Sequence, residues 1–451
     1  MALTGIGILK MLPKTNCGEC GVPTCLAFAM KVAAGQVDIG ACPHVSDEVK
    51  EKVGEASAPP IRPITLGSGD NIFEMGGETC LYRHEKRFEH PTGIAVLVMT
   101  DMDEDNIAGR LQRFNDLRYD RVGLELKADL IAVNDTTGDE GAFTSLVERV
   151  RNECPDAAII LMSDQAGCLA AGAKVCGDHK PLLYCATKEN SETMAEIARE
   201  AGCPLAVRGK TLGEAAEISE QLQKAGLKYL VLDTGARTVR AALEDQVAIR
   251  RASTKHKYKA LGFPTISFTC EMTGDPLLET MIASVLVAKY AGIIVMSDLQ
   301  GDTLFPLLLE RLNIFTDPQR PMVVEEDIYP INGPDENSPV LITCNFSLTY
   351  FIVSGEVEGS KIPSWLLIKD TEGLSVLTAW AAGKFSADLI GMFVKKSNIE
   401  DRIKHRNLII PGYLASIKGE LEEELPDWKI QIGPREASHI PPFLRDWRAE
   451  V

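Results

Sequence analysis

The chain has 451 residues, of which 45% are hydrophobic, 25% charged and only 6% aromatic. This globular composition argues against wholesale disorder, and the length predicts about two to four domains at roughly 100–200 residues each. Its 47 basic and 64 acidic side chains leave a formal net charge of −17, which disfavours nucleic-acid binding. Because the apolar runs fall short of the roughly 20 residues of a membrane span and no signal peptide is evident, we expect a cytoplasmic protein.

Two Pro- and Gly-rich segments divide the chain. We expect a cysteine-rich domain at residues 1–57, a linker at 58–92, a barrel domain at 93–315, a second linker at 316–338 and a C-terminal domain at 339–451. The Pro-rich stretch Glu55–Asp70 predicts a tether that would let the first domain move.

Four of the twelve cysteines, Cys17, Cys20, Cys25 and Cys42, follow the spacing C-x2-C-x4-C-x16-C. Four thiolates hold either a tetrahedral zinc ion or an iron–sulfur cluster. A second C-x-x-C pair, usual in zinc ribbons, is missing, and Pro43 follows the last cysteine as in ferredoxin-like sites. The spacing therefore favours iron–sulfur, with zinc as the alternative. The other eight cysteines are best explained by packing.

In the middle domain, β-branched and aliphatic runs alternate with amphipathic stretches at helical spacing. The runs are Ile94–Met99, Leu130–Asn134, Ala158–Met162, Leu182–Ala186, Leu205–Val207, Tyr229–Leu232, Thr265–Phe268 and Ile293–Met296. This alternation predicts a (β/α)8 TIM barrel, with an open doubly wound sheet as the alternative.

Polar residues follow the predicted barrel strands and would line the C-terminal mouth, where barrel enzymes hold their active sites. They are Asp101, Asp103, Asn134, Asp135, Ser163, Asp164, Lys188, Arg208, Asp233, Glu271 and Asp298. Such a set supports acid–base or metal chemistry, but Asp, Ser and Asn also cap helices in any barrel. No HExxH, GxSxG or P-loop is present, so we expect a scaffold; a barrel methyltransferase or lyase with a structural metal cluster is the alternative.

The last domain is predicted to be an open doubly wound α/β sheet, with strands at Val340–Thr343, Trp365–Ile368, Leu408–Ile410 and Trp428–Ile432. Such sheets bind ligands beyond the carboxyl ends of their strands. The loops there supply hydroxyls, glycines and backbone amides, which suit a large, flat, amide-fringed ligand. Because no GxGxxG is present, an electron-transfer protein with a bound flavin is less favoured.

Three features in this order, NCGECGVPTCLAFA, the barrel and IKDTEGLSVLTAWAAGKF, resemble the large (gamma) subunit of the corrinoid/iron–sulfur proteins of the acetyl-CoA decarbonylase/synthase system. The resemblance covers essentially the whole chain. It implies that the four cysteines bind a [4Fe–4S] cluster and that the last domain binds a corrinoid, a base-off cobalamin. The implied corrinoid contacts are Thr343, Thr349, Asp370, Thr371, Glu372, Gly373, Leu374, Ser375, Thr378, Gly412 and Gly433.

The resemblance further implies a methyl carrier of the reductive acetyl-CoA (Wood–Ljungdahl) pathway, a methyl-transfer component rather than a stand-alone enzyme. Cobalt in the Co(I) state would accept a methyl group from a methyl-tetrahydropterin such as methyltetrahydrofolate and pass it to the nickel centre of acetyl-CoA synthase. The cluster would reduce inactive Co(II). The implied partners are a small subunit forming a heterodimer, a methyltetrahydrofolate:corrinoid methyltransferase, acetyl-CoA synthase/CO dehydrogenase and a reductive activator.

No histidine lies in the D-x-H-x-x-G frame with which many corrinoid proteins ligate cobalt from below. A missing axial donor favours Co(I), because four-coordinate Co(I) loses no ligand whereas Co(II) and Co(III) do. A hydroxyl below the ring, from Thr371 or Thr378, would at most hold a water.

Overall fold

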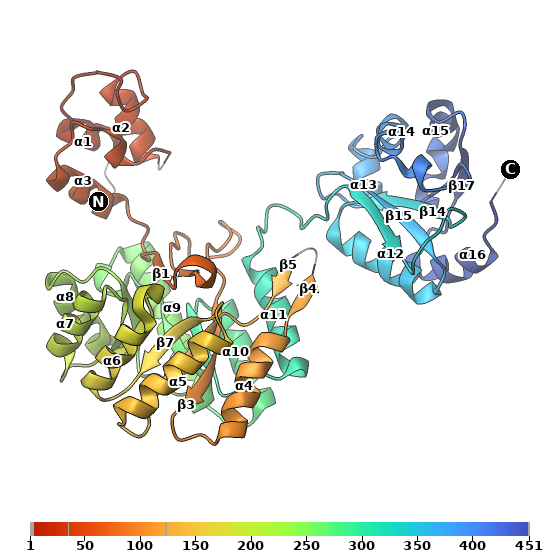
Figure 1. Ribbon diagram of the computed structural model, residues 1–451. Helices are drawn as coiled ribbons and strands as arrows, with labels where there is room; N and C mark the ends of the chain where they lie inside the picture. Colours follow the sequence, from red (N-terminus) through yellow and green to blue (C-terminus); the bar gives the residue numbers. More distant parts are fainter. Residues whose placement is uncertain (1–3, 35, 122–123, 450–451) are drawn as a thin grey trace. The chain divides into compact units, whose positions relative to one another are not determined.

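The computed structural model describes residues 4–34, 36–121 and 124–449. The chain divides into two compact units, Met1–Tyr119 with Glu125–Phe315, and Asp120–Leu124 with Thr316–Val451 (Figure 1). The first contains the cysteine-rich segment and an eight-stranded sheet, and the second a five-stranded sheet. No helix among the described residues combines the length and apolar character needed to cross a membrane.

The cysteine-rich segment forms three short helices, α1 (Gly5–Met11), α2 (Cys25–Ala33) and α3 (Asp47–Ser57). Threonines cap the first two: Thr4 accepts from the Gly7 N–H, and Thr24 accepts from the Ala27 N–H. A small apolar core joins the helices. Segments of this size rarely supply enough core to fold alone and commonly depend on a bound metal.

Eight parallel strands form the barrel, as the sequence predicts (Figure 1). They are β3 (Gly93–Met99), β6 (Leu130–Asn134), β7 (Ala158–Met162), β8 (Leu182–Ala186), β9 (Leu205–Arg208), β10 (Leu230–Asp233), β11 (Ile266–Phe268) and β12 (Ile293–Met296). Their order is β10-β9-β8-β7-β6-β3-β12-β11, and a parallel bridge from Leu232 to Thr265 joins the two edges. The sheet is therefore a nearly closed barrel rather than an open doubly wound sheet.

The helices that alternate with these strands pack their apolar faces on the outside of the barrel. They are α4 (Glu104–Asp116), α5 (Glu140–Glu153), α6 (Ala166–Cys176), α7 (Ser191–Ala201), α8 (Leu212–Lys224), α9 (Val239–His256), α10 (Pro276–Ala288) and α11 (Gly301–Phe315).

Part of the expected linker 58–92 belongs to the barrel. Its hairpin, β1 (Ile64–Leu66) with β2 (Phe73–Met75), contributes side chains to the apolar cluster inside the barrel, next to the start of β3. The Arg62 N–H also donates to the Gly262 carbonyl at 2.9 Å. Ile61 is also held here, because its carbonyl accepts from the Gly77 N–H at 2.9 Å. The tether expected at Glu55–Asp70 therefore shrinks to residues 58–60, which span at most about 11 Å when extended.

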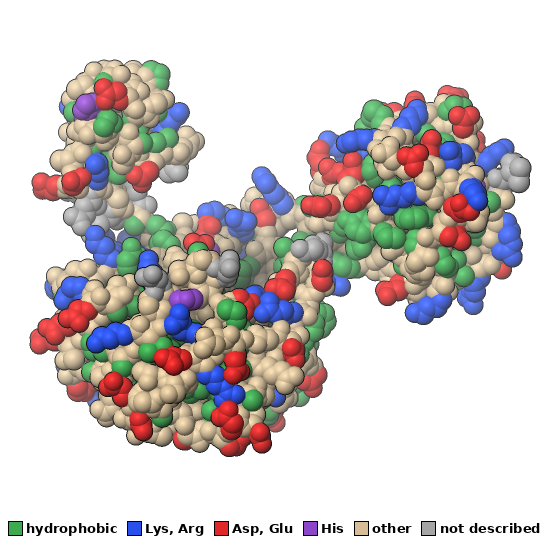
Figure 2. Space-filling model, viewed as in Figure 1, with side chains coloured by type: hydrophobic (Ala, Val, Ile, Leu, Met, Phe, Trp, Pro, Cys, Tyr) green, Lys and Arg blue, Asp and Glu red, His purple; other side chains and the backbone are tan. Residues whose placement is uncertain are grey.

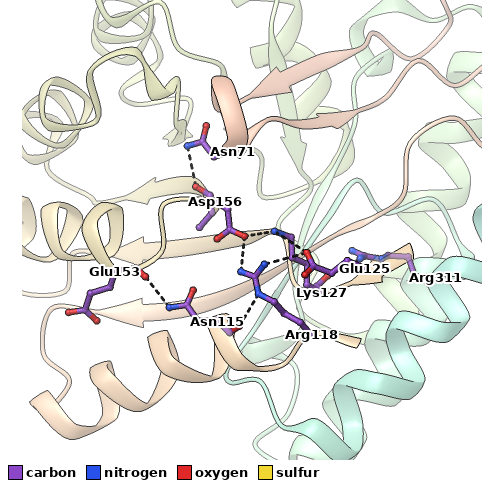
Figure 3. A network of polar contacts seen from close by, with 9 residues as sticks. Asn71, Asn115, Arg118, Glu125, Lys127, Glu153, Asp156 and Arg311 are labelled. Carbon is purple, nitrogen blue, oxygen red and sulfur yellow. Dashed lines mark hydrogen bonds and ion pairs between the residues drawn. The ribbon is translucent and has the colours of Figure 1, made fainter. Parts of the chain in front are cut away.

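A network of charges ties together the same N-terminal end of the barrel (Figure 3). It surrounds two short strands, β4 (Tyr119–Arg121) and β5 (Leu124–Leu126). The Asp156 carboxylate accepts from Arg118 at 2.7 Å and forms an ion pair with Lys127. The Arg311 guanidinium donates to the Lys127 carbonyl at 2.9 Å. We interpret this network as stabilising the fold, because barrel active sites lie at the other end.

The second unit contains four parallel strands, as predicted, and one that the sequence analysis missed. The order is β13 (Asp327–Ile331), β15 (Ser364–Lys369), β14 (Val340–Cys344), β16 (Asn407–Ile410) and β17 (Lys429–Ile432). Strand β13 is antiparallel and comes from the expected linker 316–338. The sequence analysis did not predict a strand here because of Pro330, since proline is tolerated in a strand mainly at the edge of a sheet. Strand β13 is such an edge strand.

Helices cover both faces of this sheet and form two apolar clusters. They are α12 (Ser347–Ser360), α13 (Val376–Ala381), α14 (Ala387–Lys396), α15 (Lys418–Glu424) and α16 (Ile440–Asp446). After β14 the chain passes first to β15 on one side and then to β16 on the other. The strand order thus reverses between β14 and β16, and open sheets bind ligands at such a point.

Candidate functional site

The predicted cluster ligands lie on a tight loop and on the two segments that follow it. The Gly21 N–H donates to the Gly18 carbonyl at 2.9 Å, and both glycines have a positive φ, 77° for Gly18 and 75° for Gly21. Asn16 Oδ1 accepts from the Cys25 N–H at 2.8 Å, which folds the loop back onto the start of α2. Cys25 is the first residue of that helix, whose N-terminus favours negative charge.

The four thiols differ in exposure. Cys42 and Cys25 are buried, Cys20 is half-buried and Cys17 is exposed. Among the described residues, no three of these sulfur atoms lie within 4.8 Å of one another. Sulfurs around one zinc ion lie about 3.8 Å apart, since Zn–S is about 2.3 Å, so these thiols are not gathered as a single zinc ion requires. Four cysteine thiolates are also the donor set of a four-iron cluster.

Glu19 and His44 lie beside this loop on the surface. His44 Nε2 is 2.8 Å from Glu19 Oε2, and both side chains lie within 4.8 Å of the Cys17 sulfur. They are exposed, so this contact adds a polar rim to the loop rather than a buried site.

In the second unit, a cavity of about 300 Å³ lies at the carboxyl ends of β14, β16 and β17, where the strand order reverses. Most of its lining is apolar: Leu341, Ile342, Ile352, Val353, Val376, Leu377, Ile409, Ile410, Pro411, Pro434, Ala437 and Ile440. The rest is Thr343, Thr349, Ser375, Tyr413, Gly433 and Arg435. An apolar wall with a few hydroxyls fits one face of a flat macrocycle with amide side chains.

Four of the predicted contacts, Thr343, Thr349, Ser375 and Gly433, line this cavity. Gly412 lies just behind it, and its N–H donates to the Pro434 carbonyl at 3.1 Å. A Cβ at Gly412 would lie 2.5 Å from the Gly433 carbonyl oxygen, so only glycine lets these two loops approach so closely.

The five predicted residues from Asp370 to Leu374 form a turn beside the cavity. Thr371 is fully buried, and its hydroxyl lies 2.8 Å from the Leu374 carbonyl and 2.9 Å from Asn345 Oδ1. Asp370 is exposed and accepts from the Glu372 N–H at 2.9 Å. Glu372 points to solvent and pairs with Lys384 at 2.6 Å. These residues shape the turn, and none of them lines the cavity.

Of the two threonines expected below a corrin ring, Thr378 is the one that the structure leaves accessible. It is exposed on α13, and its Oγ1 lies 3.1 Å from the Ser375 Oγ, which lines the cavity. The Thr371 hydroxyl is instead used inside the turn.

Sequence reasoning missed three polar residues at this site, Tyr413, Arg435 and Asn345. Tyr413 lines the cavity, and its hydroxyl donates to Glu436 at 2.9 Å, a bond that raises the pKa of Tyr413. Asn345 lies behind the cavity and is 3% exposed. The signal available for Asn345 was its place directly after a parallel strand. Tyr413 directly follows Gly412, and only the glycine was predicted as a contact.

The polar residues at the barrel mouth are largely bound to one another. Asp233 is 2% exposed; it accepts from the Tyr184 hydroxyl at 2.6 Å and from both terminal nitrogens of Arg237 at 2.9 and 3.1 Å. Glu271 also pairs with Arg237. Burial and the adjacent Asp233 raise the pKa of Tyr184 well above its usual range. A carboxylate held in this way is a poor general base.

Other mouth residues support helices and turns, as the capping argument predicts. Asp103 caps α4 by accepting from the Asn106 N–H at 2.9 Å, and Asp298 pairs with Arg113 at 2.8 Å. Asp135 accepts from Ser163 and from the Gly138 N–H, each at 2.8 Å; these bonds outweigh its burial and lower its pKa. The remaining members, Asp101, Asn134, Asp164, Lys188 and Arg208, are exposed or half-buried.

Comparison with known proteins gives matches over most of the chain. A family model described as CO dehydrogenase/acetyl-CoA synthase delta subunit matches residues 63–444, and an Fe-S cluster model matches residues 12–44. The corrinoid/iron–sulfur protein large subunit of Moorella thermoacetica is 44% identical, over 99% of both chains. The acetyl-CoA decarbonylase/synthase complex subunit gamma of Methanopyrus kandleri is 36% identical, over 98% of this chain and 97% of its own.

Among solved structures, a 7,8-dihydropteroate synthase from Vibrio fischeri is similar at 13% identity and a TM-score of 0.40. The match covers 56% of this chain and 99% of that chain.

Proposed function

We propose that the chain, which belongs to the CO dehydrogenase/acetyl-CoA synthase delta subunit family, is the methyl carrier of an acetyl-CoA synthase system. The observation that carries the proposal is the cavity between β14 and β16, which brings together loops from Thr343, Ser375 and Gly433. A corrinoid held there would supply a cobalt that, as Co(I), accepts a methyl group from a methyl-tetrahydropterin and yields it to the nickel centre of acetyl-CoA synthase.

The lining residues support a corrinoid that the chain does not ligate from below. None of the described residues lining the cavity is a histidine, cysteine or methionine, the side chains that donate to a soft or borderline metal. The apolar wall would exclude water from one face of the ring, and the Thr343, Thr349 and Ser375 hydroxyls would bond its amide groups. We assign the place nearest the cobalt to Thr378 rather than Thr371, since only Thr378 is exposed.

We propose that Cys17, Cys20, Cys25 and Cys42 hold a [4Fe–4S] cluster whose role is to return the cobalt to its reduced state. The donor chemistry and the Fe-S family match support this assignment. The tether of residues 58–60 limits how far this segment moves about the barrel end. A methyltetrahydrofolate:corrinoid methyltransferase, the synthase itself and a reductive activator would be the partners in the cycle.

A small subunit is a further proposed partner, since the Moorella relative is named a large subunit. Helix α10 offers a surface for it: Leu277, Leu278, Met281 and Val285 are 38–63% exposed on one side of the helix. The helix has one charged residue, Glu279, which is buried and accepts from the Ser297 N–H at 2.8 Å. An exposed helical face without charges is typical of a permanent interface.

Charge substitution tests this surface. Met281→Glu should abolish co-purification with the small subunit, while Tyr229→Glu, at an exposed residue before β10, should leave it intact. Retention of the small subunit by Met281→Glu would exclude α10 as the interface.

The metal content of the chain purified without oxygen tests the function as a whole. We expect about four irons and one cobalt per chain. Iron without cobalt would exclude the methyl carrier and favour an electron-transfer protein, whereas zinc in place of iron would exclude a redox role for the cysteines.

A further inference from the structure

Asn345 connects the end of β14 to the turn Asp370–Leu374 through both ends of its side chain. Its Oδ1 accepts from the Thr371 N–H at 3.0 Å and from the Gly373 N–H at 3.1 Å. It also lies 2.9 Å from the Thr371 hydroxyl, whose single proton is shared with the Leu374 carbonyl. Its Nδ2 donates to Asp370 Oδ1 at 2.8 Å. The amide orientation is fixed, because backbone N–H groups only donate and the Asp370 carboxylate only accepts.

The turn needs such support because its backbone is unfavourable. Glu372 has φ 56° and Gly373 has φ 76°, so two successive residues adopt the left-handed conformation. A left-handed conformation is unfavourable for a non-glycine residue such as Glu372, and it persists where the surroundings hold it. Asn345 and the Asp370 carboxylate supply the bonds that hold this turn.

The turn determines where α13 begins. Ser375 directly follows the turn, lines the cavity and accepts from the Ala379 N–H through its carbonyl at 2.7 Å. Its hydroxyl contacts Thr378 at 3.1 Å. Asn345, directly after β14, does not line the cavity, whereas Thr343 near the end of that strand does. One buried amide therefore connects the strand side of the cavity with its helix side.

We propose that Asn345 is a positioning residue for the corrinoid: it sets the distance between the β14 wall and the Ser375–Thr378 hydroxyl pair, and so the fit of the ring. The inference rests on the proposed function. An aspartate, although the same size, would place an oxygen against the Asp370 carboxylate, so the site requires the amide rather than a polar side chain of this shape.

The test compares hydroxocobalamin binding by the full-length chain and its variants, together with the electron paramagnetic resonance spectrum of bound Co(II). Asn345→Ala should weaken binding by about tenfold, and Asn345→Asp by roughly tenfold to a hundredfold. Both should change the Co(II) spectrum. The double variant Asn345→Asp with Asp370→Asn again pairs a donor with an acceptor between these two side chains, but it removes the oxygen that accepts from the Glu372 N–H. It should therefore recover part of the loss and bind more tightly than Asn345→Asp alone.

Asn332→Ala is the matched control. Asn332 Nδ2 lies 3.1, 3.2 and 3.3 Å from the carbonyl oxygens of Val357, Glu358 and Ile362, none of which lines the cavity. Its loss should therefore leave binding and spectrum unchanged. Equal losses in Asn332→Ala and Asn345→Ala would show general destabilisation and overturn the proposal, as would wild-type binding by Asn345→Asp. Failure of the unmodified chain to bind any corrinoid would instead overturn the proposed function.

Discussion

The barrel and the C-terminal sheet share one structural feature, but the loops that it brings together differ in their side chains. Both place loops at the carboxyl ends of parallel strands, where ligands bind in such folds. At the barrel mouth those loops carry acids that are bonded to neighbouring side chains, as Asp233 is to Arg237 and Tyr184. At the C-terminal sheet the corresponding loops surround an apolar cavity.

The difference shows that polar residues after parallel strands do not by themselves indicate a catalytic site. The barrel mouth contains more acids than the C-terminal sheet, yet its buried carboxylate is already neutralised. A groove at the mouth, after β8 to β10, is lined by Glu189, Arg208, Lys210 and Glu214, whose charges cancel. The space that suits a large cofactor lies where the side chains are mostly apolar. Figure 2 shows hydrophobic side chains gathered on the face of the C-terminal unit near α12 and α13, where Leu348, Ile352 and Trp380 are exposed.

The largest expected effect is the difference in corrinoid binding between two variants that each place a tryptophan in one of the two sites. Ser375→Trp places a large side chain in the C-terminal cavity and should weaken hydroxocobalamin binding by on the order of 100-fold. Arg208→Trp is the matched change at the barrel mouth and should leave binding unchanged. Equilibrium binding followed by absorbance measures both. An equal loss in the two variants would place the corrinoid at, or in contact with, the barrel mouth.

The barrel acids should matter for stability rather than for methyl transfer. Asp233→Asn removes the charge that pairs with Arg237 inside the barrel and should lower the free energy of unfolding by about 3 kcal/mol. Corrinoid loading and methyl transfer by the folded variant should match the unmodified chain. Denaturant unfolding measures the loss of stability, and a methyl-transfer assay checks that the transfer rate is unchanged. Normal stability with lost transfer would support the barrel-enzyme alternative.

The smallest expected effect concerns acid stability at the other end of the barrel. Although burial opposes it, bonding to Lys127 and Arg118 lowers the pKa of Asp156 below its ordinary value of 3.8. The Asp156 carboxylate therefore binds a proton less readily in the folded state than in the unfolded state. Its contribution to the free energy of unfolding is complete above about pH 4 and is lost as the pH falls through the lowered pKa.

Asp156→Asn should lower the free energy of unfolding at pH 7 by about 1 kcal/mol and should flatten its fall below pH 4. Chemical unfolding at several pH values measures this. If the free energy of unfolding of the variant fell as steeply below pH 4, the acid sensitivity would belong to other carboxylates.

Much of the fold could be predicted from the sequence because buried parallel strands leave a strong signal. The eight barrel runs, such as Ala158–Met162, are almost wholly apolar, and their bounds agree with the structure to within a residue. Strand β13 was missed because Pro330 and its polar neighbours do not resemble a buried strand. The hairpin β1–β2 was missed because three-residue strands next to Gly and Pro resemble a linker.

The candidate site was predictable by segment and not by side chain. The resemblance selects the loop from Asp370 to Thr378, but only the fold separates Ser375, which lines the cavity, from Thr371, which is buried in the turn. The place of Asn345 after a strand could be seen in the sequence, but its role could not be predicted, because it depends on contacts with residues 25 or more positions away.

Anomalous X-ray diffraction from crystals of the corrinoid-loaded protein, collected at the cobalt absorption edge, tests the central claim most directly. The account predicts one cobalt peak over the cavity between β14 and β16, beside Ser375 and Thr378. A cobalt peak over the barrel mouth, near Arg208, would contradict it.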